Sequence, residues 1–345
     1  MVFALMTNSG LRTKGVALIK NTIRYCSKQQ VDRKKVGIIG VPFYKGQPNA
    51  GVDLGPKVLR ENGKLVSVLR EQTDLLEVKD YGDISYEPIH TNSGVRNLKN
   101  LPEVAGVNRA LSDKVFQILK DGRVCLTLGG DHSIGIGTVD GHLRYDSNAI
   151  VFWVDAHADI NTNTTSHSGN IHGMPLSFVL KELANTWTSV SELKTWLEPR
   201  LPCKNLVYLA LRDVDEGEKK FIQDLGILAY GMKEIDRHGV KNVMEMAFEH
   251  VDPNQDKHYH CSFDIDSLDS KEAPSTGTKV RGGLTLREGL QIVEHLHDTG
   301  RLDALDLTEV NPAIGDNTDV ATTVRAAIAV ISSGVGGNRY AYITH

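Results

Sequence analysis

The chain has 345 residues, of which 40% are apolar and 24% are charged, and its formal net charge at pH 7 is −4. This length allows one large α/β domain or two smaller ones; we expect one, because no linker rich in Pro, Gly or Ser divides the chain. The small net charge argues against nucleic acid as a partner. No apolar run approaches the roughly 20 residues that cross a bilayer, which argues against a membrane span.

The N-terminal segment, residues 1–31, differs from the rest because it contains no Asp or Glu. On a helix, apolar residues such as Val16 and Ile19 would share one face, while basic residues such as Lys20 would lie on another. A basic amphipathic segment without acidic residues is typical of a mitochondrial transit peptide. The alternative is the basic tail of a cytoplasmic protein. We expect residues 1–31 to be a leader and residues 32–345 to form the folded domain.

After this segment, short apolar runs alternate with longer stretches of helical periodicity. The runs predict strands at residues 36–41, 124–128, 150–154, 206–211, 227–230, 260–263 and 304–307. Helical periodicity predicts helices at residues 56–70, 107–120 and 286–299, and Thr285 with Glu288 forms a capping box before the last of these. Nearly continuous apolar strands that alternate with helices indicate a doubly wound, mostly parallel sheet in the α/β class.

Polar side chains follow four of the predicted strands, where open parallel sheets bind their ligands. They are Asp131 and His132, then Asp155, His157 and Asp159, then Asp264 and Asp266, and finally Glu309. Extended residues two apart point to the same side, so we expect the three ligand-type residues of VDAHADIN to converge on one locus. The carboxyl edge of the sheet is therefore the predicted functional site.

This set of side chains predicts a metal centre, because so many adjacent carboxylates cannot all stay ionised without a cation. Four Asp and two His without Cys favour Mn²⁺ over structural zinc. Six protein ligands exceed what one catalytic ion binds if it keeps a position for water, whereas two ions about 3.5 to 4 Å apart can share carboxylates. The residues therefore predict a dinuclear site.

Several polar residues near these strands also have simpler structural interpretations. Asp215 and Glu218 in RDVDEGE are typical of a helix N-terminus, where acidic side chains stabilise the first turn. His172 before a glycine and Glu309 before Val-Asn-Pro are compatible with turns. Trp153, inside an apolar run, is expected in the core. Residue chemistry alone leaves these alternatives open.

Seven motifs occur in the chain in the order GGDHS, DAHADIN, SGNIHGMP, RDVDEGE, SFDIDSLD, TGTKVRGGLT and EVNP. Together they closely resemble the arginases of the ureohydrolase family, over residues 36–334. The resemblance implies a single three-layer α/β/α domain, assembly as a homotrimer, and hydrolysis of L-arginine to L-ornithine and urea with two Mn²⁺ per chain. With its basic leader, the chain is similar to the mitochondrial form.

The resemblance also implies a role for each matched residue. One Mn²⁺ would be held by His132, Asp155, Asp159 and Asp264, and the other by His157, Asp155, Asp264 and Asp266. A hydroxide between the ions would attack the guanidinium carbon, with Asp159 as its proton acceptor, Glu309 as the guanidinium anchor and His172 as proton donor to the leaving amine. The matched substrate-binding residues are Asn161, Ser166, Ser168, Asp215, Glu218 and Thr278.

The loop NTNTTSHSGN departs from the usual family pattern, because Asn163 replaces a Pro and His167 stands where Thr or Ser is typical. These differences affect the expected selectivity rather than the metal chemistry. The closest rival function is hydrolysis of agmatine or another guanidino compound, although the partners of the α-amino and α-carboxylate groups favour arginine. More distant rivals are a metal-stabilised binding protein without turnover and a zinc-dependent deacetylase, whose mononuclear site would not need six ligands.

Overall fold

The computed structural model describes residues 34–72, 76–91 and 95–337, so the expected leader at residues 1–31 lies outside the described residues. Its centre is one eight-stranded sheet with the strand order β2-β1-β3-β8-β7-β4-β5-β6. Every pair of neighbouring strands is parallel. The predicted α/β class and the parallel sheet are confirmed.

The strands are β1 Lys34–Gly40, β2 Leu76–Asp83, β3 Val124–Leu128, β4 Ile150–Val154, β5 Leu206–Leu211, β6 Leu228–Gly231, β7 Tyr259–Asp264 and β8 Leu302–Thr308. The helices are α2 Gly55–Glu61, α3 Leu65–Gln72, α4 Leu101–Lys120, α5 Gly135–Tyr145, α6 Pro175–Val179, α7 Ser191–Lys194, α8 Glu216–Leu225, α9 Met232–Val251, α10 Leu286–Asp298 and α11 Asn317–Val335. Within the described residues, no helix combines the length and apolarity needed to cross a bilayer.

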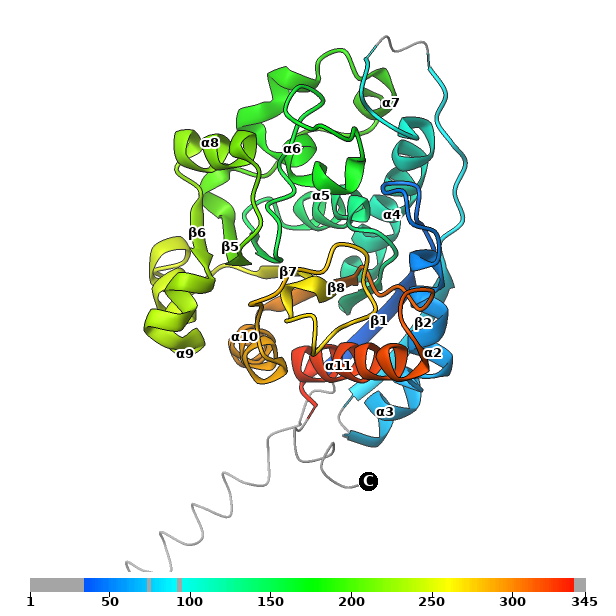
Figure 1. Ribbon diagram of the computed structural model, residues 1–345, viewed down its shortest axis with the longest axis vertical. Helices are drawn as coiled ribbons and strands as arrows, with labels where there is room; N and C mark the ends of the chain where they lie inside the picture. Colours follow the sequence, from blue (N-terminus) through cyan, green and yellow to red (C-terminus); the bar gives the residue numbers. More distant parts are fainter. Residues whose placement is uncertain (1–33, 73–75, 92–94, 338–345) are drawn as a thin grey trace, which may run out of the picture.

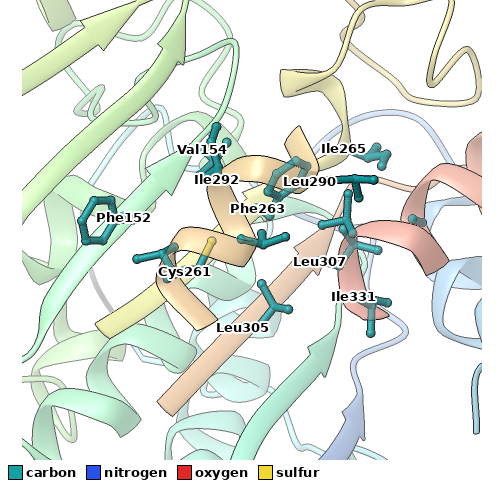
Figure 2. Close-up of a cluster of buried hydrophobic side chains, with 14 of the residues drawn as sticks. Phe152, Val154, Cys261, Phe263, Ile265, Leu290, Ile292, Leu305, Leu307 and Ile331 are labelled. Carbon is teal, nitrogen blue, oxygen red and sulfur yellow. The ribbon is translucent and has the colours of Figure 1, made fainter. Parts of the chain in front are cut away.

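Helices cover both faces of the sheet and give the molecule three layers (Figure 1). Buried side chains of α2, α3, α9, α10 and α11 pack against one face. Side chains of α4, α5, α6, α7 and α8 pack against the other. Figure 2 shows the first of these two cores, where Phe152, Cys261 and Leu305 of the central strands meet Ile292 and Ile331 of the covering helices. Two apolar faces explain why the strand sequences are nearly continuous apolar runs.

The structure corrects the sequence prediction at two elements. Strand β2 was not predicted, because its sequence LEVKDYGD is largely polar and it lies at the edge of the sheet, where one side meets solvent. The helix expected at residues 56–70 is two helices, α2 and α3, separated around Lys64, whose φ of 47° is left-handed and incompatible with a continuous helix. The capping box of Thr285 and Glu288 is present at α10 as predicted.

Candidate active site

The acidic and imidazole side chains meet at the carboxyl edge of the four central strands. His132 lies in a short 3-10 helix after β3, Asp155 directly follows β4, Asp264 ends β7, and Glu309 directly follows β8. These strands are neighbours in the order β3-β8-β7-β4 although they are far apart in sequence. The parallel sheet therefore brings together residues from four separate segments, as the strand-end pattern predicted.

Two groups of potential metal ligands are joined by one carboxylate, that of Asp155. His132, Asp155 and Asp264 form the first group, and Asp155, His157 and Asp266 form the second. The His132 Nδ1 atom lies 3.0 Å from Asp155 Oδ2, 3.1 Å from Asp264 Oδ2 and 3.3 Å from Asp159 Oδ2. The His157 Nδ1 atom lies 3.3 Å from both Asp155 Oδ1 and Asp266 Oδ2. All six predicted ligands thus surround one locus.

The sequence led us to expect an extended segment that points these side chains to one side. In the structure they converge through tight turns instead. The His157 amide donates to Asp155 Oδ1 at 2.7 Å, and the Asp266 amide donates to Asp264 Oδ1 at 2.8 Å, so each first aspartate caps its own tight turn. Asp159 has a left-handed φ of 52°. The predicted convergence of the side chains is correct, but the predicted extended backbone is wrong. An aspartate side chain that accepts a hydrogen bond from the amide two residues later favours a turn over an extended conformation.

The electrostatics of the cluster favour the binding of cations. Burial and the neighbouring carboxylates raise the pKa values of Asp159, Asp264 and Asp266. Burial alone would lower the pKa values of His132 and His157, yet the adjacent aspartates raise both. Asp266 Oδ1 is buried and has no hydrogen-bond partner. Oxygen and imidazole ligands without cysteine, with an orphaned carboxylate oxygen among them, fit a pair of hard or borderline divalent cations.

Glu309 and His172 adjoin this cluster. Glu309 is 3% exposed, its φ of 62° is left-handed, and its Oε1 accepts a hydrogen bond of 2.8 Å from the His132 amide. The same oxygen lies 3.4 Å from His172 Nδ1. Burial opposes a charge on His172, but Glu309 outweighs it and raises the pKa of the imidazole. Neither residue occupies a plain solvated turn, so the simpler interpretations from sequence are insufficient.

A cavity of about 290 Å³ opens beside the cluster. Its walls include the ligands His132, His157, Asp159 and Asp264, the imidazole of His172, and all six predicted substrate-binding residues, Asn161, Ser166, Ser168, Asp215, Glu218 and Thr278. Asp155, Asp266 and Glu309 lie deeper and are at most 3% exposed. The cavity therefore has buried ligand candidates at its floor, and its other walls carry uncharged polar groups and three further carboxylates, those of Asp213, Asp215 and Glu218.

The acidic residues of RDVDEGE serve both the helix and the cavity. Asp215 is the N-cap of α8, as its sequence position suggested, and its Oδ2 accepts a hydrogen bond of 2.9 Å from Asn161 Nδ2. Buried Glu218 accepts from the amides of Asp215 at 3.0 Å and Ile160 at 3.1 Å, and burial raises its pKa to about 7. Glu218 thereby ties α8 to the segment that carries Asp159 and Asn161. Thr278 donates to Asp266 Oδ2 at 3.0 Å.

Trp153 was assigned only to the core, and the structure gives it a second role. It is fully buried, as predicted, but its Nε1 donates to Asp155 Oδ2 at 3.1 Å. Its ring also stacks on that of His132, with centroids 4.0 Å apart and an interplanar angle of 9°. A signal for this role exists in the sequence, because residues two apart on a strand share a face and Trp153 precedes Asp155 by two.

Comparisons with known proteins identify relatives of the chain. Residues 34–336 match the Arginase family. The chain is 45% identical over 298 residues to Arginase-1 of Homo sapiens, covering 86% of this chain and 91% of that protein. It is 44% identical over 306 residues to the mitochondrial Arginase-2 of Mus musculus, covering 88% and 85%. The crystal structure of arginase from Bacillus caldovelox superposes with a TM-score of 0.78 at 37% identity, covering 89% of this chain and 99% of that one.

Proposed function

Because the chain belongs to the arginase family, we propose that it hydrolyses L-arginine to L-ornithine and urea with two bound Mn²⁺ ions. The observation that carries this proposal is the pair of ligand groups joined by Asp155 at the floor of a polar cavity. Such a pair of ions supplies a nucleophile at neutral pH by lowering the pKa of a water molecule. The residues of the chain supply binding, orientation and proton transfer.

The ligands are assigned from the two groups and their neighbours. His132, Asp155, Asp159 and Asp264 would hold one ion, and His157, Asp155, Asp264 and Asp266 the other. Asp159 and Asp264 both approach His132 Nδ1 within 3.3 Å, which supports their place at the first ion. The orphaned Oδ1 of Asp266 supports a ligand role at the second. Manganese is favoured because four carboxylates and two imidazoles suit a six-coordinate borderline ion.

Glu309, His172 and Asp159 would handle the guanidinium group. The buried Glu309 carboxylate can bind the guanidinium by charge-assisted hydrogen bonds, which are strong where water is excluded. His172 shares an oxygen of Glu309 at 3.4 Å, so a proton on its imidazole lies next to the group that leaves. Asp159 lies beside the first ligand group, 3.3 Å from His132 Nδ1, where its carboxylate would accept the proton of the attacking water.

The mouth of the cavity would bind the amino-acid end of the substrate. Asp215 offers the negative charge that an α-ammonium requires, and Glu218 supports it by accepting from the Asp215 amide. Asn161, Ser166 and Ser168 offer neutral hydrogen-bond donors to an α-carboxylate. Thr278 lines the same cavity and donates to Asp266. Agmatine has no α-carboxylate, so the donors on this side favour arginine.

The test is to purify the chain with Mn²⁺, count metal ions per chain, and measure urea release from L-arginine and agmatine. We expect two ions per chain and a kcat/KM for arginine about 5- to 150-fold above that for agmatine, since loss of a polar contact costs about 1 to 3 kcal/mol. Faster release of urea from agmatine than from arginine would reject arginase activity and favour hydrolysis of agmatine. A protein that binds Mn²⁺ and releases no urea from either would be a binding protein.

Assembly and location form a separate part of the proposal. We propose a homotrimer, by resemblance to the family, and import into mitochondria directed by residues 1–31. The basic, acid-free composition of that segment supports import. Sedimentation equilibrium of the purified chain tests the trimer. Fusion of residues 1–31 to a fluorescent protein tests the leader, and cytoplasmic fluorescence would support the alternative of a basic tail.

A further inference from the structure

The His132 ring has three sets of contacts, and only one of them is with the candidate metal ligands. Its Nδ1 faces three carboxylates, and its ring stacks on Trp153. Its other nitrogen, Nε2, lies 3.0 Å from the hydroxyl of Ser262. A neutral imidazole carries one proton on one of its two nitrogens, and it binds a cation through the other. What holds the proton on Nε2 therefore decides whether Nδ1 can serve as a ligand.

The residues behind His132 form a row across the sheet. Strand pairing places Asp306 of β8 beside Ser262 of β7, and Ser262 beside Trp153 of β4. Asp264 at the end of β7 and Asp155 directly after β4 lie two residues further along the chain than Ser262 and Trp153, and so one step closer to the cavity. Asp306, Ser262 and Trp153, here called the supporting row, are all fully buried directly beneath the ligands.

The hydrogen bonds of the supporting row have a defined direction. Asp306 Oδ2 accepts from Thr138 Oγ1 at 2.6 Å and from Ser262 Oγ at 3.2 Å, and it lies 2.8 Å from His260 Nε2. Burial opposes ionisation, but the nearby His260 and the Thr138 hydroxyl lower the pKa of Asp306. An ionised carboxylate only accepts hydrogen bonds. Ser262 must then donate its single hydrogen to Asp306, and its oxygen can only accept from His132 Nε2.

We propose that Ser262 and Asp306 are positioning residues that fix the tautomer of His132, with the proton on Nε2 and the Nδ1 lone pair directed at the bound cation. Trp153 completes the support by fixing the plane of the ring and the Asp155 carboxylate. Burying a serine, an aspartate and a histidine in a sheet core costs free energy unless they are hydrogen-bonded. Their common function beneath the ligands explains why this face of the central strands is not filled with aliphatic side chains. The proposal relies on the proposed function only for the presence of two ions.

The test measures Mn²⁺ binding to the full chain after substitution of each positioning residue. Ser262→Ala removes the acceptor of the Nε2 proton, and we expect about 10- to 100-fold weaker binding of one ion, the magnitude typical of such supporting contacts. Asp306→Asn is isosteric, but its amide can donate to Ser262, which then can donate to Nε2 and favour the opposite tautomer. We therefore expect Asp306→Asn to weaken binding at least as much as Ser262→Ala, the reverse of the order that packing alone predicts.

Three controls separate positioning from general loosening of the core. Cys261→Ala changes the residue next to Ser262 on β7, which points into the apolar core of Figure 2 because neighbouring strand residues face opposite sides, and should keep both ions at wild-type affinity. Ser262→Thr keeps the hydroxyl and should retain affinity better than Ser262→Ala. Thr138→Val removes one donor to Asp306 without contact to His132 and should weaken binding less than Asp306→Asn. If Ser262→Ala does not fold, the comparison of Asp306→Asn with Thr138→Val decides the question.

Electron paramagnetic resonance supplies a readout independent of catalysis. Loss of one ion should convert the spectrum of a coupled Mn²⁺ pair into that of isolated Mn²⁺, at about one ion per chain after dialysis. Two ions held at wild-type affinity in both Ser262→Ala and Asp306→Asn would overturn the positioning role, and so would an equal loss in Cys261→Ala. A wild-type chain that binds no Mn²⁺ would instead reject the proposed metal centre.

Discussion

Two acidic residues of the site have a backbone conformation that residues other than glycine rarely adopt. Asp159 has a φ of 52° and Glu309 a φ of 62°. A left-handed conformation at a non-glycine residue costs of order 1 kcal/mol and persists where the surroundings impose it. Glu309 directly follows β8 and accepts from the His132 amide, and the Asp159 carboxylate lies 3.3 Å from His132 Nδ1. The strain is located at the two carboxylates that would orient the nucleophile and the guanidinium.

The first prediction concerns Asp264, which the proposal places between both ions. Asp264→Ala should lower the metal content and reduce kcat/KM for arginine by about 100-fold or more, because a bound ion contributes several kcal/mol of charge stabilisation. Metal analysis together with urea release measures both effects. A variant with two tightly held ions and the wild-type rate would contradict the ligand assignment.

The second prediction concerns His167, the residue that departs from the family pattern. It is exposed and lines the cavity together with Ser166 and Ser168. His167→Thr should leave kcat and the metal content unchanged and alter KM by roughly twofold, since exposed substitutions usually change free energies by about 0.5 kcal/mol. A large fall in kcat would show that this imidazole takes part in the reaction.

At the scale of elements, a buried carboxylate fixes the C-terminal end of α9. Asp252, directly after α9, is 1% exposed and accepts hydrogen bonds from the Tyr259 hydroxyl at 2.5 Å and the Asp256 amide at 3.1 Å. Arg301 lies 3.6 Å from the same carboxylate. Burial opposes ionisation, yet these donors and Arg301 lower the pKa of Asp252. This carboxylate therefore fastens the end of α9 to the start of β7.

The third prediction follows from the lowered pKa of Asp252. Since its pKa in the folded state is below the unfolded value of about 3.9, its ionisation stabilises the fold above that pH, and the contribution is lost as the pH falls through the folded pKa. Asp252→Asn should lower the free energy of unfolding at pH 7 by about 1 to 3 kcal/mol. The difference should shrink below about pH 4. Chemical denaturation at pH 7 and at pH 3 measures it, and a difference independent of pH would reject this assignment.

At the scale of the whole molecule, the proposed ions would connect three separate segments of the sheet. Their ligands follow β3, β4 and β7; β3 and β4 are consecutive in the sequence, but β8 and β7 lie between them in the sheet. Without cations, the buried carboxylates repel one another, as the raised pKa values of Asp159 and Asp264 indicate. Metal binding should therefore stabilise the folded chain as well as supply its chemistry.

The fourth prediction is that Mn²⁺ raises the thermal midpoint of the purified chain. At a free concentration 100 times the dissociation constant, each site should add about 2.7 kcal/mol to the free energy of unfolding. Differential scanning fluorimetry with and without a chelator measures the shift. The Asp264→Ala variant is the matched control and should respond little; an equal shift in both proteins would mean that the metal acts elsewhere.

Most features that depend on neighbouring residues in the sequence were predicted correctly, and most features that depend on distant contacts were not. Strands β3, β4 and β5 were predicted with their observed bounds, because their apolar runs are continuous and end at polar residues. The edge strand β2 was missed, because one side of it faces solvent and its sequence is polar. The ligands were recognisable, since each follows a strand. The role of Ser262 and Asp306 was not, because it depends on the register between β7 and β8.

The sequence by itself determined the α/β class, most of the strands, the identities of the six candidate ligands and the resemblance to a hydrolase family. These features depend on local patterns, namely apolar runs, strand-end residues and short motifs. The tertiary structure alone decided that β8, β7 and β4 are neighbours, that Asp159 and Glu309 adopt left-handed backbone, and that a polar row lies beneath His132. Each of these depends on contacts between residues far apart in the chain, whose free energies no local segment contains.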